Sequence, residues 1–277
     1  MSQTLKTLLT IGGSDPCGGA GIQADIRAGI SCGVHVMTAI TAVTAQNSHG
    51  VMAVNPVTSE ILEQQINAVI NEVMPDAVKI GMLGSLENAG VVSEFIRNLF
   101  GEIPVVVDPV MKASSGGNLS EESEIIIDFY GQNIFPFATV VTPNLKEATQ
   151  FLETSGLKNI TNPIEIAITL LRLWNTNAVA LKGGHSENEE VTDILADYFD
   201  SSVVVAKTTH PRIECKNLHG TGCVYASLLA SFLALGFPLQ DAFMKTSKKI
   251  FEIISASCNY SLGNSAYGPL NINNYRL

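Results

Sequence analysis

The sequence predicts a single α/β domain in which a mainly parallel, doubly wound sheet is flanked by helices. Three observations indicate this fold class. Short apolar runs typical of buried strands alternate along the 277 residues with segments typical of helices. Hydrophobic residues make up 46% of the chain and charged residues only 15%, which suits a sheet buried on both faces. No internal repeat, low-complexity tract or linker divides the chain, so residues 1–277 are expected to form one domain.

The chain opens with a predicted strand and a glycine-rich loop. Residues 7–11 form a short apolar run that ends at two glycines, and a helix is expected from about 22 to 31. Residues 34–44 are rich in Val, Ile and Thr and predict a second strand, which leads into the polar segment 45–50. The loop at 12–21 superficially resembles a dinucleotide-binding fingerprint, but its spacing is wrong and Pro16 interrupts it.

Helices and strands continue to alternate after this opening. In segment 60–73 the apolar positions share one face, which predicts a helix. Further strands are expected at 77–82, 104–107, 138–142 and 178–182. Further helices are expected at 86–99, 121–133, 163–173, 224–235 and 239–258, with one more opened by residues 143–147. Two strand-like runs, 191–199 and 203–208, predict a hairpin at one edge of the sheet.

The charge balance excludes several classes of partner. Sixteen Lys and Arg residues against 26 Asp and Glu residues give a formal net charge of −10. This argues against nucleic acid or an anionic membrane as the main partner, because both favour positive charge. An anionic substrate would have to be held by local donors instead. The five cysteines have no metal-like spacing and the N-terminus has no signal-peptide pattern, so a protein of the reducing cytoplasm is expected.

The most informative segment is 218–223, which leads directly into the apolar run 224–235. Its two glycines flank Thr221 just before a helix, where backbone N–H groups have no intrahelical partner. Together with the positive end of the helix dipole, these donors predict an anion site suited to a phosphate. Cys223 lies at the same terminus, where the pKa of a thiol is expected to be depressed. The alternative is a glycine-rich turn into a core helix, with Cys223 as a small buried residue.

Polar side chains follow nearly every predicted strand. In a doubly wound sheet, ligands bind outside the carboxyl ends of the strands, so residues at these positions are expected to meet in one site. The residues at these positions are Asp15, Gln46, Met82, Asp108, Asn144 with Glu147, and Lys182.

Seven segments, in order along the chain, resemble the hydroxymethylpyrimidine/phosphomethylpyrimidine kinases of thiamin synthesis, which belong to the ribokinase superfamily. The segments are 13–25, 37–51, 76–83, 105–111, 142–148, 181–185 and 219–223. The resemblance implies a ribokinase-like domain that uses ATP and Mg²⁺. It implies phosphorylation of the alcohol of 4-amino-5-hydroxymethyl-2-methylpyrimidine, and then of the resulting monophosphate. A homodimer is expected from the resemblance alone.

The resemblance also implies roles around the predicted anion site. Cys223 would be the base facing the substrate alcohol. The backbone of Gly220, Thr221 and Gly222 would form the anion hole for the transferred phosphoryl group, a sensible device because this reaction depends on positioning and charge stabilisation.

A second group of residues would serve the nucleotide. Asn144 and Glu147, with Asp108 nearby, would organise Mg²⁺ and phosphates through oxygen ligands or bound waters. Lys182 would reach the nucleotide phosphates as a point charge. A capping box formed by Asn144 and Glu147 is a simpler interpretation that is compatible with the metal role.

For the pyrimidine, the resemblance implies contacts from Gln46, Asp25, Gly13, Met82 and Val110. The amide of Gln46 offers one acceptor and two donors, which match an aminopyrimidine edge. The structural alternatives are a surface carboxylate for Asp25 and core positions for Met82 and Val110.

Two other functions remain open at this point. A pyridoxine or pyridoxal kinase of the same family would act on a ring of similar size, although a pyridine without the amino group would leave the Gln46 amide incompletely paired. A non-catalytic ligand-binding relative is the other alternative, against which the presence of Cys223, Asn144 and Glu147 argues.

The sequence departs from the family pattern in three places. Ser114 and Gly117 stand where the family usually has a lysine and an aspartate, so a phosphate contact is lost or shifted to Lys112, which bears on the second phosphorylation. The C-terminal glycine element at 263–269 is irregular, and Cys17 replaces a common serine.

Overall fold

The structure is a computed structural model that describes residues 4–99, 101–110, 121–185, 188–263 and 267–272. Within these residues one nine-stranded sheet has the order β3-β2-β1-β4-β5-β6-β7-β8-β9. The strands are β1 (Thr7–Ser14), β2 (His35–Asn47), β3 (Gly50–Pro56), β4 (Ala77–Ile80), β5 (Val105–Val107), β6 (Val140–Val141), β7 (Ala178–Leu181), β8 (Glu190–Phe199) and β9 (Ser202–Pro211). The pairs from β2 through β1, β4, β5 and β6 to β7 are parallel.

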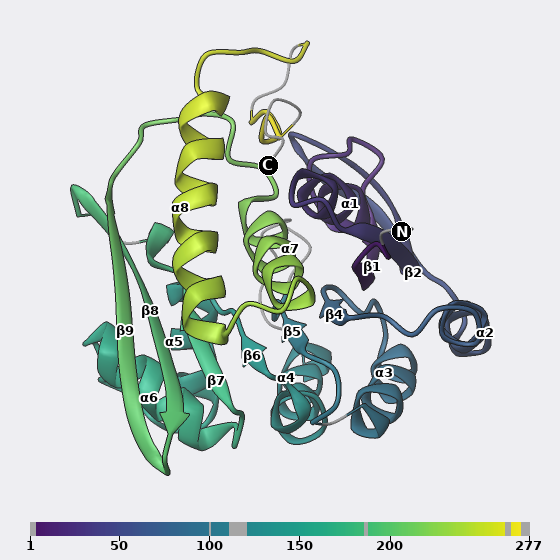
Figure 1. Ribbon diagram of the computed structural model, residues 1–277, viewed down its shortest axis with the longest axis horizontal. Helices are drawn as coiled ribbons and strands as arrows, with labels where there is room; N and C mark the ends of the chain where they lie inside the picture. Colours follow the sequence, from purple (N-terminus) through teal and green to yellow (C-terminus); the bar gives the residue numbers. More distant parts are fainter. Residues whose placement is uncertain (1–3, 100, 111–120, 186–187, 264–266, 273–277) are drawn as a thin grey trace.

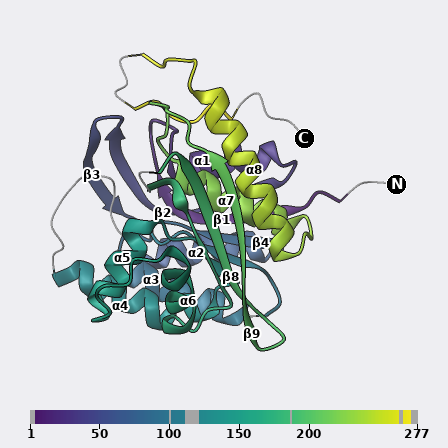
Figure 2. The same cartoon turned by 90° about the vertical axis from the view of Figure 1, so that its left-hand side faces the viewer.

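Helices cover both faces of the sheet (Figures 1 and 2). The helices are α1 (Gly21–Ser31), α2 (Ser59–Ile70), α3 (Leu86–Asn98), α4 (Glu121–Asn133), α5 (Leu145–Thr154), α6 (Pro163–Leu173), α7 (Thr221–Ala234) and α8 (Leu239–Ser257), with short 3₁₀ turns η1 (Phe135–Phe137) and η2 (Gly183–His185). Helices α1, α7 and α8 lie on one face, and α2 to α6 lie on the other (Figure 1). The predicted fold class is therefore confirmed.

The sheet separates two hydrophobic cores, and β1 shows how the sequence supplies both. Leu8 packs into the core beneath α1, α7 and α8, whereas Leu9 and Ile11 pack into the core beneath α2 to α6. All three side chains are fully buried. Successive side chains of a strand point to opposite faces, so a strand covered on both sides is apolar at most positions.

Polar residues just before the helices explain where several of them begin. The side chains of Thr58, Ser85 and Asn162 each accept a hydrogen bond from a backbone N–H in the first turn of α2, α3 and α6. These contacts satisfy donors that the helix itself leaves unpaired. Helix α7 is different, because Gly220 precedes it and no side chain caps it.

The sheet edges differ in how well the sequence predicted them. The hairpin of β8 and β9 is confirmed as an antiparallel edge. The other edge was not predicted: β2 continues to Asn47 and turns into β3, which pairs with it in an antiparallel manner. Gln46 therefore lies inside a strand, opposite Val51, rather than in a polar loop. Residues 51–54 of β3 are all apolar, which is a strand signal that the prediction missed, although most of the strand is exposed.

Among the described residues, no helix has both the length and the apolar character needed to cross a bilayer.

Candidate active site

A cavity of about 420 Å³ opens at the carboxyl ends of the central strands, beside the first turn of α7. It brings together all but two of the residues that the sequence predicts for the site, Asp15 and Asp25. These are Gly13, Gln46, Met82, Asp108, Val110, Asn144, Glu147, Lys182, Gly220, Thr221, Gly222 and Cys223. Met82 and Val110 are half-buried and line the cavity, so they are not ordinary core residues.

The first glycine-rich loop is held in place by Asp15. Its carboxylate accepts hydrogen bonds from the backbone N–H groups of Cys17, Gly19 and Ala20 at 2.8–3.0 Å. The Nε2 atom of His219 lies 3.1 Å from the same carboxylate. Burial raises the pKa of Asp15, but the hydrogen bonds from His219 and the backbone outweigh burial and lower it overall. Asp15 therefore joins the first loop to the segment that leads into α7.

The start of α7 has the geometry that the sequence predicts for an anion site. Gly220 takes a left-handed conformation with φ of 84°, and the first N–H groups of the helix have no intrahelical partner. A β-carbon on Gly222 would lie 3.4 Å from the Nζ atom of Lys182. The ammonium group and the positive end of the helix dipole therefore act on the same part of the cavity.

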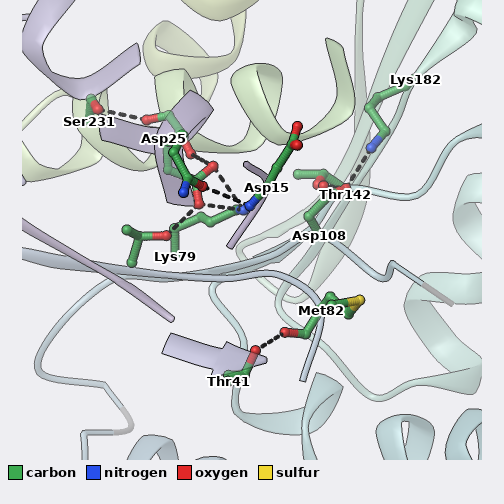
Figure 3. A network of polar contacts seen from close by, with 12 residues as sticks. Asp15, Asp25, Thr41, Lys79, Met82, Asp108, Thr142, Lys182 and Ser231 are labelled. Carbon is green, nitrogen blue, oxygen red and sulfur yellow. Dashed lines mark hydrogen bonds and ion pairs between the residues drawn. The ribbon is translucent and has the colours of Figure 1, made fainter. Parts of the chain in front are cut away.

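Lys182 forms a buried ion pair with Asp108 across this region, with Nζ 2.7 Å from Oδ1 (Figure 3). Burial lowers the pKa of Lys182, but Asp108 and Glu147 outweigh this effect and raise it. The Lys182 side chain is therefore a permanent positive charge on the cavity wall.

Asn144 and Glu147 form the capping box that the sequence predicted at the start of α5. The backbone N–H of Asn144 donates to Glu147 at 2.8 Å, and the N–H of Glu147 donates to the Asn144 side chain at 3.0 Å. Burial raises the pKa of Glu147 to about 7, and Asp108 adds to the rise while Lys182 opposes it. The carboxyl group can therefore gain or lose a proton near neutral pH.

The expected depression of the Cys223 pKa is wrong. Burial raises the pKa of this thiol to about 11, and the charges of Asp108 and Asp25 add to the rise. Lys79 and the backbone N–H of Gly21 oppose it without overcoming it. A helix terminus favours the thiolate, but removal of the sulfur from water and two nearby carboxylates disfavour it more strongly.

The structure also corrects the prediction that Asp25 contacts the substrate. Asp25 is fully buried beneath the cavity and is not a surface carboxylate either. Thr10 and Ser227 each donate a hydroxyl hydrogen bond to it, at 2.5 and 2.7 Å. The Nζ atom of Lys79 lies 3.0 and 2.9 Å from its two oxygens (Figure 3).

Lys79 and His219 line the cavity, although neither was predicted as a site residue. A signal for Lys79 was present in the sequence. A lysine inside the apolar strand 77–80 has to be buried, and a buried charge needs a partner. The signal for His219 was its place directly before the Gly-Thr-Gly segment.

The three segments that depart from the family pattern differ in how far the structure describes them. Ser114, Gly117 and Lys112 lie outside the residues that the structure describes. Cys17 is exposed, and its Sγ atom lies 3.3 Å from the backbone oxygen of Gln46. At the irregular C-terminal element, the backbone oxygen of Gly268 accepts a hydrogen bond from the N–H of His219 at 3.2 Å.

Comparisons with known proteins identify the family. A family model described as phosphomethylpyrimidine kinase matches residues 15–271. The hydroxymethylpyrimidine/phosphomethylpyrimidine kinase of Bacillus subtilis is 38% identical over 266 residues, covering 95% of this chain and 93% of that protein. A probable thiamine biosynthetic bifunctional enzyme of Oryza sativa is 36% identical over 262 residues. This match covers 95% of the chain but only 46% of the rice protein.

Solved structures of related kinases share the fold of this chain. The pyridoxal kinase of Staphylococcus aureus in complex with AMP-PCP and pyridoxal is 28% identical with a TM-score of 0.81, covering 99% of this chain and 95% of that one. The phosphomethylpyrimidine kinase of Clostridium difficile is 35% identical with a TM-score of 0.72, covering 89% of this chain and 98% of that one. By the family model, the matched sequence and the shared fold, the chain belongs to the phosphomethylpyrimidine kinase family.

Proposed function

We propose that the protein is a kinase of thiamin biosynthesis. It transfers the γ-phosphoryl group of ATP to the hydroxymethyl group of 4-amino-5-hydroxymethyl-2-methylpyrimidine, and then phosphorylates the monophosphate. The observation that carries this proposal is one cavity that joins Gln46 to the anion-binding start of α7. A pocket for a polar ring and a site for a transferable phosphate therefore share one space.

The ring end of the cavity suits an aminopyrimidine. Gln46 supplies an amide with one acceptor and two donors, and Gly13, Met82 and Val110 line the same cavity. The hydroxyl of Thr41 donates to the backbone oxygen of Met82 at 2.6 Å, which fixes the chain at this wall (Figure 3). A β-carbon on Gly13 would lie 2.5 Å from the methyl group of Met82, so glycine at this position leaves room for the Met82 side chain.

The phosphate end suits ATP. The backbone donors at the start of α7 and the ammonium of Lys182 can bind the phosphates locally. Such local donors are needed because the net charge of the protein is negative. Solved pyridoxal kinases with the same fold were obtained in complex with ADP and with AMP-PCP. Both observations support a nucleotide at this end.

The residues present also fit Mg²⁺. Among the described residues, no group of three or more His, Cys, Asp or Glu side chains could hold a metal ion alone. Mg²⁺ usually binds through one or two carboxylates, substrate phosphates and waters. Asp108 and Glu147 would provide such carboxylates, with Asn144 assisting through water. When bound, the ion neutralises charge on the nucleotide phosphates.

Cys223 is the proposed base for the substrate hydroxyl. Its side chain lies at the start of α7, next to the backbone donors that would hold the transferred phosphoryl group. With a pKa of about 11, the thiolate is a minor form at neutral pH, so the rate is expected to rise with pH.

A nucleotide-consumption assay tests the proposal directly. ADP should form when the protein is given ATP, Mg²⁺ and the aminopyrimidine alcohol, and a smaller rate is expected with pyridoxal. ADP formation with pyridoxal alone would favour the related pyridoxal kinases instead. Turnover with neither compound would indicate a ligand-binding protein without catalysis. The cytoplasmic location and the homodimer stay predictions.

A further inference from the structure

Lys79 places a buried ammonium group in the wall of the active-site cavity. Its side chain is 1% exposed, and the residue nevertheless lines the same cavity as Cys223. A β-carbon on Gly81 would lie 2.9 Å from Nζ, so the ammonium group sits toward the carboxyl end of β4, where the cavity opens. The charge of Lys79 is thus directed toward the site rather than toward solvent.

Four elements of the fold hold this ammonium group through Asp25. The carboxylate comes from α1, and both of its oxygens lie within 3.0 Å of Lys79 on β4. Thr10 on β1 and Ser227 on α7 donate to the same carboxylate. Ser227 lies four residues after Cys223 and so on the same face of α7. The network therefore ties Lys79 to the helix that carries Cys223.

The stability of the fold does not explain the buried ion pair of Lys79 and Asp25. Replacing a buried ion pair by apolar side chains is often neutral or stabilising, because removal of two charges from water is costly. Strand β4 is otherwise made of Ala, Val and Ile, all fully buried. A charged pair at this place, at the edge of a cavity, is better explained by what it does to the cavity.

We infer that Lys79 and Asp25 are positioning residues of the proposed kinase reaction. The ammonium group of Lys79 stabilises negative charge on the Cys223 sulfur, and Asp25 keeps that group in place and charged. This inference rests on the proposed function and deepens it. The charged groups that act on Cys223 are Lys79 from β4, Lys182 after β7, Asp108 after β5 and Asp25 from α1. Of the two cations, Lys79 has the larger effect on the thiol.

The chemical step is a proton transfer coupled to phosphoryl transfer. The substrate hydroxyl gives its proton to the Cys223 thiolate while its oxygen bonds to the γ-phosphorus of ATP. The bond from that phosphorus to the bridging oxygen breaks, and ADP leaves. Lys79 takes no proton in this step, because its pKa is raised in spite of burial, mainly by Asp25. Its role is to increase the thiolate population before the step.

The test is the rate at which iodoacetamide alkylates Cys223, followed by peptide mapping at a fixed alkaline pH. Well below the pKa, the thiolate fraction changes about tenfold per pKa unit. Lys79→Met should therefore slow alkylation by about 5–10-fold, because the cation that stabilises the thiolate is lost. The matched control is Lys249→Met. Lys249 is also buried, but it donates to the backbone oxygen of Ser31 and should leave the rate unchanged.

The double variant Lys79→Met/Asp25→Asn covers the case in which Lys79→Met alone fails to fold, because it leaves no unpaired buried charge. Its alkylation should be slower than in the wild type, since Lys79 acts on Cys223 more strongly than Asp25 does. Its kcat should fall at least about tenfold with a smaller change in the KM for the pyrimidine. Folded Lys79→Met or double-variant protein with unchanged alkylation would overturn the inference. The wild-type kinase assay tests the proposed function separately. Slower alkylation in Lys79→Met, in a protein without kinase activity, would support the charge relation and refute the proposed function.

Discussion

The backbone of Gly220 lies so close to Gly19 that a β-carbon on residue 220 would sit 1.8 Å from the carbonyl oxygen of Gly19. The two glycine-rich segments, 200 residues apart in the sequence, are thus in direct backbone contact beside the cavity. Gly220 also has a φ of 84°, which a residue with a side chain rarely adopts. Both conditions must hold for the start of α7 to face the cavity with its N–H groups free.

Gly220→Ala should therefore reduce activity far more than a simple loss of stability would. The added methyl group must move one of the two loops, and a displacement of about 1 Å in a reacting group can cost about 10²-fold in rate. The matched control is Gly236→Ala, which also has positive φ, at 87°, but meets no atom within 4 Å. Both variants should lose about 1–2 kcal/mol from left-handed strain. Equal kcat/KM values in the two variants would contradict a role for the Gly19–Gly220 contact.

Removal of the Cys223 thiol should lower kcat by roughly 10²–10⁴-fold, the usual contribution of a positioned base. ATP binding should survive Cys223→Ala, because the backbone donors of α7 remain. Cys258→Ala, at the end of α8, is the control and should keep normal kcat. A Cys223→Ala protein with near wild-type kcat would reduce Cys223 to a packing residue.

The pH dependence of the wild-type rate should report the same thiol. Because the pKa of Cys223 is about 11, the reactive thiolate is lost as pH falls, by about tenfold per pH unit. Single-turnover rates should therefore climb from neutral into alkaline pH, and the climb should be absent in Cys223→Ala. A flat wild-type profile over this range would show that the step needs no base. Bound pyrimidine should also protect Cys223 from iodoacetamide.

Glu147→Gln should change stability with a definite sign. The pKa of Glu147 is about 7 in the folded protein against an ordinary value of 4.5, so folding favours the protonated form. The stabilisation is therefore fully present below about pH 4.5 and is lost as pH rises through 7. Thermal unfolding should show Glu147→Gln gaining stability over the wild type across this window, by up to about 3 kcal/mol. A difference that does not depend on pH would contradict the raised pKa.

The same variant tests the magnesium role. Glutamine keeps the size of Glu147 and can still accept the capping hydrogen bond from Asn144, but it lacks the charge. The variant should need a higher Mg²⁺ concentration to reach its maximal rate, because one carboxylate is lost from the metal site. An unchanged Mg²⁺ titration would leave Glu147 as a cap of α5 only.

Gln46→Met should distinguish the pyrimidine from pyridoxal. Loss of a matched polar contact in a buried site costs on the order of 1–3 kcal/mol, or roughly 5–150-fold in kcat/KM. The loss should be large for the pyrimidine and small for any pyridoxal activity. Gln65→Met is the control, because the Gln65 amide binds the backbone of Ile40 at 2.9 and 3.0 Å rather than the cavity. Equal losses on both substrates in Gln46→Met would remove Gln46 as the specificity residue.

The sequence determined most of the fold and the location of the site, because both depend on local patterns. Apolar runs such as 77–80 mark strands, and polar residues such as Asn144 mark the start of a helix. Once the strands are parallel, residues that follow them must meet at one edge of the sheet. Asp108, Asn144 and Lys182 could therefore be assigned to one site from their positions in the chain alone.

The tertiary structure decided the features that depend on residues far apart in the sequence. Strand β3 has a short apolar run at 51–54, but its place at the edge of the sheet follows from its pairing with β2. Asp25 and Lys79 are 54 residues apart, and only the packing of α1 against β4 makes them an ion pair beneath the cavity. The pKa of Cys223 likewise depends on burial and on charges from other elements, which outweigh the helix terminus that the sequence displays. Electrostatic interactions depend on burial and on distances in space, and a pattern along the chain gives neither. The electrostatics of this site could therefore not be obtained from the sequence.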